Sequence, residues 1–362
     1  MNIYEIDKNF QPPSGVPAEE IEWFNCAEEP FTLYGGMRDE KGYCRIPRDI
    51  AKTVSEGVEF LNEHTAGLRF RFKTNSPYIG LAVKWNNHGK MYHMASTGSS
   101  GFDLYSVDNG IHSFKTVLAP FELDPKEGYS TFKYLNISKN ETYKEGKVTD
   151  YIMNFPLYNS VTEVYVGLKK GSVLEKGGEY THSIPAVFYG SSITQGGCAS
   201  RPGTSYEGFL SRALDMDYIN LGFSGNGKGE KEIVDYMKNL KMSMFISDYD
   251  HNAPTLEHLK ETHYKMYENI RTVNPDLPYV MISKPDFCNS SDWGRRETIM
   301  ETYAKALANG DKNVYFVDGA GIFNGIEAGD CTVDGTHPTD LGFYKMSEAF
   351  YPVIKLILSK KD

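Results

Sequence analysis

One serine and one histidine of this chain have the surroundings that acyl-transfer chemistry requires. Ser192 follows a short apolar run and a glycine, in Gly190-Ser191-Ser192-Ile193-Thr194. His337 lies far downstream, and Asp334 precedes it by three residues. A serine that a histidine deprotonates, with a carboxylate to orient that histidine, can attack a carbonyl carbon and form a covalent intermediate. We therefore take Ser192, His337 and Asp334 as candidate nucleophile, base and orienting acid.

Two more residues are candidates for stabilising the negative charge that develops on the carbonyl oxygen. Gly225 follows a second predicted strand and offers a backbone N–H, and Asn252 follows a third and offers a side-chain amide. With the N–H of Ser192 they would form an oxyanion hole, in which each donor is worth about 10²–10³ in rate. Each of these loop residues alone is also an ordinary turn residue, so the prediction depends on the whole set.

The second half of the chain must position these residues, and its pattern is that of a parallel α/β sheet. Apolar runs at 184–189, 218–221, 242–247, 279–282 and 314–317 read as strands. They alternate with predicted helices at 205–214, 230–240, 256–273, 295–309 and 340–358, which favours three layers. The candidate residues follow the strands, at the sheet edge where such folds bind ligands.

The first half reads as β structure. Residues 68–73 alternate apolar and basic side chains, and Asp108-Asn109-Gly110 separates two strand-like runs, which is a strong hairpin signal. Further strands are expected at 78–85, 129–137 and 161–168, with one helix at 47–55, so we predict a β-sandwich. A charged, glycine-rich segment at 169–179 reads as a linker. We expect two domains, 1–178 and 179–362, because 362 residues exceed one ordinary core.

The bulk composition excludes several classes of partner. The net charge of −10 argues against binding to nucleic acid or to an anionic membrane surface. No apolar run approaches the roughly 20 residues of a transmembrane helix. The first residues have neither the basic nor the apolar segment of a signal peptide, so we expect either a cytoplasmic protein or one whose leader has been removed. The sequence does not determine whether the protein forms a homo-oligomer.

The cysteines do not indicate a disulfide framework or a zinc site. There are five, widely spaced, at positions 26, 44, 198, 288 and 331. An odd number without any closely spaced pair favours reduced thiols. We predict no metal site and no cofactor.

Four sequence blocks resemble those of the SGNH (GDSL-like) hydrolase superfamily. Ser192 matches the nucleophile of the first block, Gly225 the glycine of the second, and Asn252 the asparagine of the third. Asp334 and His337 match the Asp-x-x-His of the last block. The run 196–203 resembles one branch of the superfamily, in which an N-terminal β-sandwich carries a Gly-x-Asp-Leu-Tyr signature. Residues 101–105, Gly-Phe-Asp-Leu-Tyr, fit that signature.

The resemblance has two departures. Ser191 replaces the usual acidic residue before the nucleophile, which is not part of the triad. The third block is usually Gly-x-Asn-Asp and here reads Asp250-His251-Asn252-Ala253. Asp250 and His251 would either shape substrate choice or cap the loop. Arg201 and Asp103, from the two branch-specific runs, are further candidates for substrate binding.

The resemblance implies a three-layer SGNH-type domain, preceded by a β-sandwich of jelly-roll type. It implies a serine esterase that hydrolyses a carboxylic ester through a Ser-His-Asp triad and an acyl-enzyme. Because similar β-sandwiches occur beside carbohydrate esterases, an O-acetyl group on a sugar is the first substrate expected. An acyltransferase with the same triad, and a carbohydrate-binding protein with an inactive hydrolase domain, are the alternatives.

Overall fold

A computed structural model of the protein describes residues 1–10, 16–87, 89–118, 128–131, 135–139, 143–285 and 293–360. The chain forms two compact units, and each of them combines separate stretches of sequence. Unit 1 contains Met1–Arg45, Glu63–Tyr180 and Arg201–Gly203, and unit 2 contains Ile46–Asn62, Thr181–Ser200 and Thr204–Asp362. The domain boundary after residue 178 stays a prediction.

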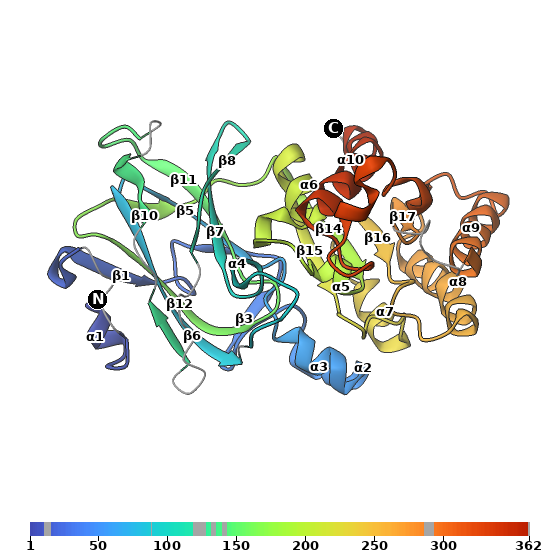
Figure 1. The fold of residues 1–362 in the computed structure, drawn as a ribbon, viewed down its shortest axis with the longest axis horizontal. Helices are drawn as coiled ribbons and strands as arrows, with labels where there is room; N and C mark the ends of the chain where they lie inside the picture. Colours follow the sequence, from blue (N-terminus) through green and yellow to red (C-terminus); the bar gives the residue numbers. More distant parts are fainter. Residues whose placement is uncertain are drawn as a thin grey trace. The chain divides into compact units, whose positions relative to one another are not determined.

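Unit 2 is built on a five-stranded sheet in which all strands are parallel. Its order is β15-β14-β16-β17-β18, and the first four of these strands are labelled in Figure 1. The strands are β14 (His182–Gly190), β15 (Met216–Gly222), β16 (Met244–Asp248), β17 (Tyr279–Ile282) and β18 (Val314–Val317). The five strands predicted for this half are confirmed, with ends shifted by at most two residues.

Helices cover both faces of this sheet because successive strand residues point to opposite sides. On β14, Val187 and Tyr189 join a large apolar cluster, whereas Phe188 packs against Tyr206. The cluster includes residues of α2 (Arg48–Val54), α3 (Glu56–Asn62), α7 (Lys231–Met237), α8 (Leu256–Val273) and α9 (Trp293–Ala308). The opposite layer contains α6 (Tyr206–Leu214) and α10 (Asp340–Ser359), where Tyr206 contacts Phe350.

Side-chain caps fix where these helices begin. The hydroxyls of Ser205, Thr255 and Thr339 accept hydrogen bonds from backbone N–H groups three residues onward, at the starts of α6, α8 and α10. Serine and threonine are preferred at this position because they satisfy donors that the helix leaves unpaired. The helix predicted at 47–55 is α2, and the sequence did not predict α3, which follows it directly.

Unit 1 contains two antiparallel sheets that enclose a shared apolar core. One has the order β1-β12-β6-β10, with β9 also paired to β6: β1 (Ile21–Asn25), β12 (Ser160–Lys169), β6 (Tyr78–Asn87), β10 (Leu135–Asn136), β9 (Tyr129–Thr131). The other has the order β13-β5-β11-β7-β8, with β2 paired to β5: β13 (Leu174–Lys176), β5 (Arg69–Thr74), β11 (Thr149–Asn154), β7 (Phe102–Asp108), β8 (Ile111–Leu118), β2 (Thr32–Tyr34).

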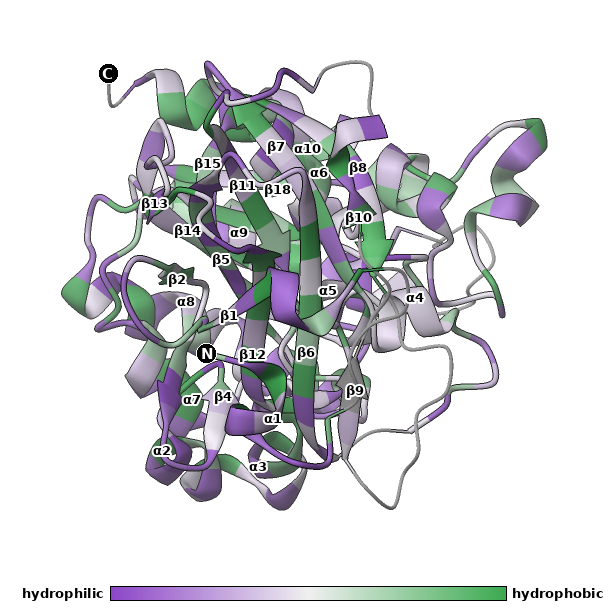
Figure 2. Ribbon diagram, turned by 90° about the vertical axis from the view of Figure 1, so that its left-hand side faces the viewer, coloured by the Kyte–Doolittle hydropathy of each residue, from purple (hydrophilic) through white to green (hydrophobic). Residues whose placement is uncertain are grey.

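The core of unit 1 follows from alternation along its strands. Ile79, Leu81 and Val83 of β6 point into the core, together with Phe70 and Phe72 of β5. Apolar bands on β6 and β12 are visible in Figure 2. The predicted predominance of strands in this half is confirmed, while the jelly-roll arrangement stays a prediction. Short elements complete the unit: α1 (Ile3–Ile6), α4 (Ser96–Ser99) and the hairpin β3 (Met37–Asp39) with β4 (Gly42–Cys44).

The hairpin predicted around Asn109-Gly110 joins β7 and β8. Both turn residues have positive φ, 50° for Asn109 and 75° for Gly110, which is the backbone form that this dipeptide favours in tight hairpins. The predicted linker at 169–179 was wrong in part, because Leu174–Lys176 form β13 and pair with β5. Its charges and glycines concealed a short edge strand, a position where polar residues are common.

The described cysteines fit the prediction of reduced thiols. Cys26, Cys44, Cys198 and Cys331 are buried thiols that form no disulfide with one another. Cys288 lies outside the described residues. Among the helices that the structure describes, none is both long and apolar enough to cross a membrane.

Candidate active site

The strand-to-helix turn after β14 presents Ser192. The strand ends at Gly190, where a side chain would clash with the carbonyl oxygen of Asp248 on the neighbouring strand. The short helix α5 (Ser192–Gln195) then begins, with the hydroxyl of Ser191 accepting from the N–H of Ile193 at 3.1 Å. The N–H of Ser191 donates to the Asp248 carbonyl oxygen at 3.1 Å. These contacts hold Ser192 at the carboxyl end of a central strand.

A continuous line of hydrogen bonds joins the three candidate catalytic residues. Ser192 Oγ lies 2.9 Å from Nε2 of His337, and Nδ1 of His337 lies 2.8 Å from Oδ2 of Asp334. With the ring proton on Nδ1 donated to the carboxylate, Nε2 accepts the serine hydroxyl. The structure therefore brings together residues that are 145 positions apart in the sequence.

The loop before α10 keeps Asp334 charged. Its Oδ1 accepts from the backbone N–H groups of Thr336 and His337, at 3.0 and 2.8 Å. Burial alone would raise the pKa of Asp334, but the hydrogen bonds from the backbone and ring of His337 outweigh it and lower the pKa to about 2. The carboxyl group is thus ionised at any pH near neutrality, as an acid that orients an imidazole must be.

Gly225 and Asn252, the two predicted oxyanion residues, contact each other. The N–H of Gly225 donates to Oδ1 of Asn252 at 3.2 Å, and Nδ2 of Asn252 donates to the carbonyl oxygen of Phe223 at 2.8 Å. Gly225 has a φ of +69° and open space where a side chain would stand. The asparagine therefore ties the loop after β16 to the loop after β15.

A cavity of about 460 Å³ lies in unit 2 over these loops. The residues that line it are Ser192, Ser224, Gly225, Asp250, His251, Asn252, Lys284, Arg295, Arg296, Thr336 and His337. Sequence reasoning missed the three cationic residues of this set. Only Ser283 separates Lys284 from the end of β17. Because ligands bind at the carboxyl ends of parallel strands, the sequence pattern could have indicated Lys284 as a candidate. Arg295 and Arg296 lie in the first turn of α9 and carried no such signal.

Asp250 and His251, predicted as candidates for substrate binding, line this cavity but are deeply buried. Their side chains are 1% and 6% exposed, and Oδ1 of Asp250 lies 3.6 Å from Nε2 of His251. Oδ2 of Asp250 accepts from the N–H of Lys284 at 3.1 Å. Burial raises the pKa of Asp250 to about 6, and burial together with Lys284, His337 and Arg295 lowers the pKa of His251 well below its usual value.

One group in this region has the residue types of a metal site. Asp248, Asp250 and His251 offer three ligand atoms within 4.8 Å of one another. Desolvation and the proximity of Asp250 raise the pKa of Asp248 to about 7. The positive charges of Lys284 and Arg295 act on Asp250 and His251, and they would oppose a cation there. We therefore treat the group as a pair of buried carboxyls beside an imidazole.

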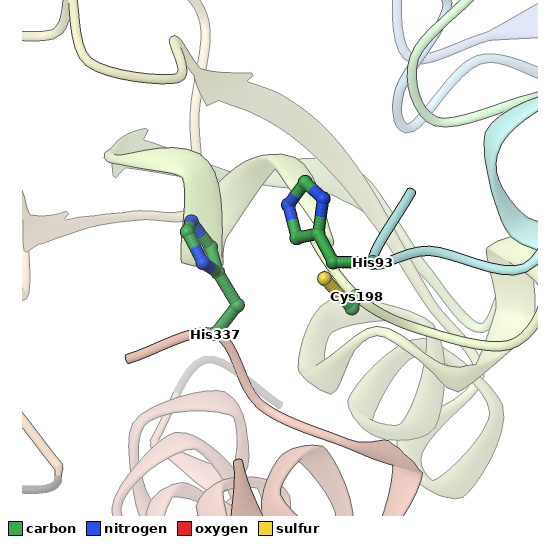
Figure 3. A group of neighbouring side chains, drawn as sticks. All are labelled: His93, Cys198 and His337. Atoms are coloured by element: carbon green, nitrogen blue, oxygen red, sulfur yellow. The ribbon is translucent and has the colours of Figure 1, made fainter. Parts of the chain in front are cut away.

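Cys198 lies near His337, the candidate base, without competing with Ser192 as a nucleophile. Its sulfur is within 4.8 Å of a ring nitrogen of His337 (Figure 3). Burial, followed by the charge of Asp334, raises the pKa of Cys198 to about 12. A thiol with such a pKa stays protonated near neutrality, so it is a poor nucleophile.

Asp103 and Arg201, the other candidates for substrate binding, both belong to unit 1, and neither is among the residues that line the cavity. Asp103 is fully buried and accepts from the N–H of Gly203 at 2.8 Å, from Nδ2 of Asn154 at 2.8 Å and from the hydroxyl of Tyr105 at 3.2 Å. Arg201 Nε lies 3.5 Å from the same carboxylate. Through these contacts Asp103, the aspartate of the Gly-x-Asp-Leu-Tyr signature, holds residues 201–203 in place. A role of Asp103 and Arg201 in substrate binding stays a prediction.

Two family models match most of the chain. Residues 183–355 match the GDSL-like lipase/acylhydrolase family, and residues 21–174 match the N-terminus of SGNH-hydrolase-type esterases, named after the Gly-x-Asp-Leu-Tyr signature. No curated protein gave a significant match.

Solved structures share the fold over nearly the whole chain. A protein from Bacteroides ovatus described as a GDSL-like lipase is 27% identical, with a TM-score of 0.82, covering 94% of this chain and 98% of that one. A salicylyl-acyltransferase from a tetracycline biosynthetic pathway is 19% identical, with a TM-score of 0.71 and coverage of 92% and 96%. A family two carbohydrate esterase from Cellvibrio japonicus is 12% identical, with a TM-score of 0.58 and coverage of 94% and 99%.

The two family matches adjoin and leave only short stretches of the chain uncovered. They agree with the Bacteroides ovatus structure, which resembles both halves together. The chain therefore belongs to the SGNH (GDSL-like) family of carboxylic ester hydrolases and carries that family's Gly-x-Asp-Leu-Tyr domain at its N-terminus.

Proposed function

We propose that this protein is a serine esterase whose substrate is an O-acetyl group on a carbohydrate. The observation that carries the proposal is the hydrogen-bonded line from Ser192 through His337 to Asp334. The nucleophile, the base and the orienting acid are within hydrogen-bonding distance, and the cavity lies directly over the first two. This is the geometry that serine acyl transfer requires.

The reaction would proceed in two proton-balanced halves. Nε2 of His337 takes the proton of Ser192 as Oγ attacks the ester carbonyl, and the imidazolium then gives that proton to the departing alkoxide. A water molecule attacks the acyl-serine, with His337 again taking a proton and returning it to Ser192 as the acid leaves. Asp334, ionised throughout, stabilises the imidazolium in both halves.

The developing oxyanion would be held by the N–H of Ser192 and by the amide of Asn252. An asparagine amide has two donor hydrogens, and the carbonyl oxygen of Phe223 accepts from that nitrogen at 2.8 Å. The N–H of Gly225 bonds Asn252 Oδ1 at 3.2 Å, which is at the long end for such bonds, so a charged oxygen would compete well for it.

Two features support a carbohydrate ester. The fold resembles those of family two carbohydrate esterases, one of which, from Clostridium thermocellum, was solved in complex with cellohexaose. Those likenesses are at 12–14% identity and concern the fold alone. The cavity itself is lined almost entirely by polar and charged residues, which suits a sugar better than a long acyl chain.

An acyltransferase is the second candidate, because the salicylyl-acyltransferase has a higher TM-score than the carbohydrate esterases named above. Both reactions use the same residues and differ only in whether water or an alcohol takes the acyl group from Ser192. Product analysis with an added alcohol separates them. The third possibility, a carbohydrate-binding protein without activity, is disfavoured by the assembled triad.

The decisive experiment compares the native protein with Ser192→Ala on acetylated sugars and on 4-nitrophenyl esters of increasing chain length. We expect acetate release by the native protein and a loss of at least about 10⁴-fold in kcat in the variant, because the covalent step is removed. Circular dichroism should show that the fold is unchanged. Full activity in Ser192→Ala would refute the proposal.

A further inference from the structure

The helix that carries the nucleophile is a single turn, so its position depends on what its residues bind. α5 has four residues, Ser192–Gln195. A helix of that length has almost no stability of its own in water. Thr194, two residues after the nucleophile, is fully buried. Its side chain contacts β16 and its backbone contacts β15, the two strands that flank β14 in the sheet.

The side chain of Thr194 meets Asp248, the last residue of β16. Oγ1 of Thr194 lies 3.2 Å from Oδ2 of Asp248, and the hydroxyl of Tyr206 lies 3.4 Å from the same carboxylate oxygen. The two hydroxyl oxygens are 3.3 Å apart. All three side chains are fully buried. Each hydroxyl has one hydrogen to donate and a carboxylate oxygen can accept both, so the three oxygens form a closed triangle that joins α5, α6 and β16.

The backbone of the same turn is bound on both sides. The carbonyl oxygen of Asp248 accepts from the N–H of Ser191 at 3.1 Å. Nδ2 of Asn220, on β15, donates to the carbonyl oxygen of Thr194 at 2.5 Å. Asp248 therefore contacts the chain before the nucleophile through its backbone and the chain after it through its side chain.

The carboxyl group of Asp248 is unfavourable to bury if its role is only to hold the fold together. Its Oδ1 has no hydrogen-bond partner among the described residues. Burial, followed by the charge of Asp250, raises its pKa to about 7. An apolar side chain of similar volume would avoid this desolvation cost. Proteins retain such groups mainly where function requires them, which here means the catalytic turn that the carboxyl group contacts.

We propose that Asp248 is a positioning residue: through the two hydroxyls that it binds, it holds Ser192 in line with His337. The inference rests on the proposed esterase function and concerns side chains that do not touch the substrate, because none of the three in the triangle lines the cavity. His337 is held by a separate loop. A shift of α5 alone would therefore lengthen the 2.9 Å contact between Ser192 Oγ and Nε2 of His337. A misplacement of about 1 Å can cost about 10²-fold in rate.

Removing one hydroxyl at a time tests the proposal. Thr194→Val and Tyr206→Phe keep the shape of each side chain and delete its contact with Asp248. We expect Thr194→Val to lower kcat on an acetyl ester by at least about tenfold, and Tyr206→Phe to lower it less, because only Thr194 belongs to α5. KM should change little, since neither side chain touches the substrate.

Two other buried contacts in unit 2 supply matched controls. Oγ1 of Thr302 in α9 lies 2.9 Å from Nδ1 of His263, and the hydroxyl of Tyr267 in α8 donates to Oδ2 of Asp311 at 2.7 Å. None of these four residues lines the cavity. Thr302→Val and Tyr267→Phe should lower the melting temperature, as the triangle variants do, but should leave kcat unchanged. Rates are measured well below the melting temperature of each variant.

Variants of Asp248 itself test whether the hydroxyl contacts are what matters. The amide oxygen in Asp248→Asn can still accept from both hydroxyls, so this variant should keep most of kcat. Asp248→Leu cannot accept them and should lose at least about tenfold. If Asp248→Leu does not fold, the comparison of Thr194→Val with Thr302→Val decides the question.

The possible results separate this inference from the function on which it rests. Full kcat in Thr194→Val overturns the positioning role, as do equal losses of kcat in the triangle variants and their controls, or in Asp248→Asn and Asp248→Leu. If the native protein hydrolyses esters and Ser192→Ala does not, the esterase function stands in each of these cases. If the native protein hydrolyses no ester, the proposed function fails and the positioning role fails with it.

Discussion

Two aspartate–histidine pairs line the same cavity, and their environments are opposite. Asp334 and His337 are 37% and 23% exposed, and Oδ2 lies 2.8 Å from Nδ1. Asp250 and His251 are 1% and 6% exposed, and Oδ1 lies 3.6 Å from Nε2. Asp334 and His337 are hydrogen-bonded to each other and accessible to water. Asp250 and His251 are buried, and the distance between them is too long for a good hydrogen bond.

The consequences for charge follow from that difference. Hydrogen bonds prevail over desolvation at Asp334 and lower its pKa to about 2, whereas desolvation prevails at Asp250 and raises its pKa to about 6. The same two residue types thus give a carboxyl that stays ionised at any pH near neutrality in one loop and a carboxyl that begins to take up a proton as the pH falls toward 6 in the other. Residue identity alone does not assign a catalytic role.

The largest expected contrast is between the two histidines. His337→Gln should lower kcat by at least about 10⁴-fold, because it removes the base, while His251→Gln should lower kcat by less than about tenfold. Initial rates on the same acetyl ester, with circular dichroism to verify folding, measure the contrast. Comparable losses in both variants would mean that the buried pair takes part in catalysis.

A smaller contrast is expected between the two aspartates. Asp334→Asn should cost about 10³–10⁴-fold in kcat, because an amide neither holds the required tautomer nor stabilises the imidazolium. Asp250→Asn should cost less than about tenfold, since the amide oxygen can still accept from the N–H of Lys284. The two variants are matched in shape, so steady-state kinetics compare the charges directly. An equal loss of kcat in both variants would contradict the assignment of the orienting role to Asp334 and not to Asp250.

The smallest expected effect concerns stability, and its sign differs between the two carboxyls. The pKa of Asp250 is raised in the folded state, so its contribution is present below about pH 4 and is lost as the pH rises toward 6. The pKa of Asp334 is lowered, so its contribution is present above about pH 4 and is lost as the pH falls toward 2.

Urea unfolding of the native protein and of both asparagine variants, from pH 3 to pH 8, tests this. Relative to the native protein, Asp250→Asn should gain unfolding free energy between about pH 4 and 6, by at most about 1.4 kcal/mol per pH unit for one proton. Asp334→Asn should show no such gain over that interval. Parallel curves for all three proteins would contradict the assigned charges.

The sequence was informative where local pattern and global fold agree. The helix predicted at 256–273 has those ends in the structure, because Thr255 caps it and its apolar residues recur at helical spacing. Ser192, Asn252 and His337 were found because the carboxyl ends of parallel strands meet at one edge, so that three remote loops converge.

The sequence was uninformative where a role depends on partners far along the chain. Lysine and arginine are common on protein surfaces, so the sequence does not distinguish Lys284 and Arg295. Only the fold places them in the same cavity lining as Ser192. The burial that distinguishes Asp250 from Asp334 is equally invisible in a list of residues. The sequence did not show that Asp103 is buried, because its hydrogen bonds reach residues 51 and 100 positions away. Periodicity carries no information about such contacts.

The interleaving of the two compact units limits how this protein can be dissected. Residues 46–62 lie early in the chain, yet Ile46, Val58 and Leu61 belong to the apolar cluster around the parallel sheet. Residues 201–203 lie late, yet the N–H of Gly203 bonds the buried Asp103. A gene fragment that encodes either half as one continuous stretch would therefore omit part of that half's interior, so neither half is a cassette that recombination could transfer intact.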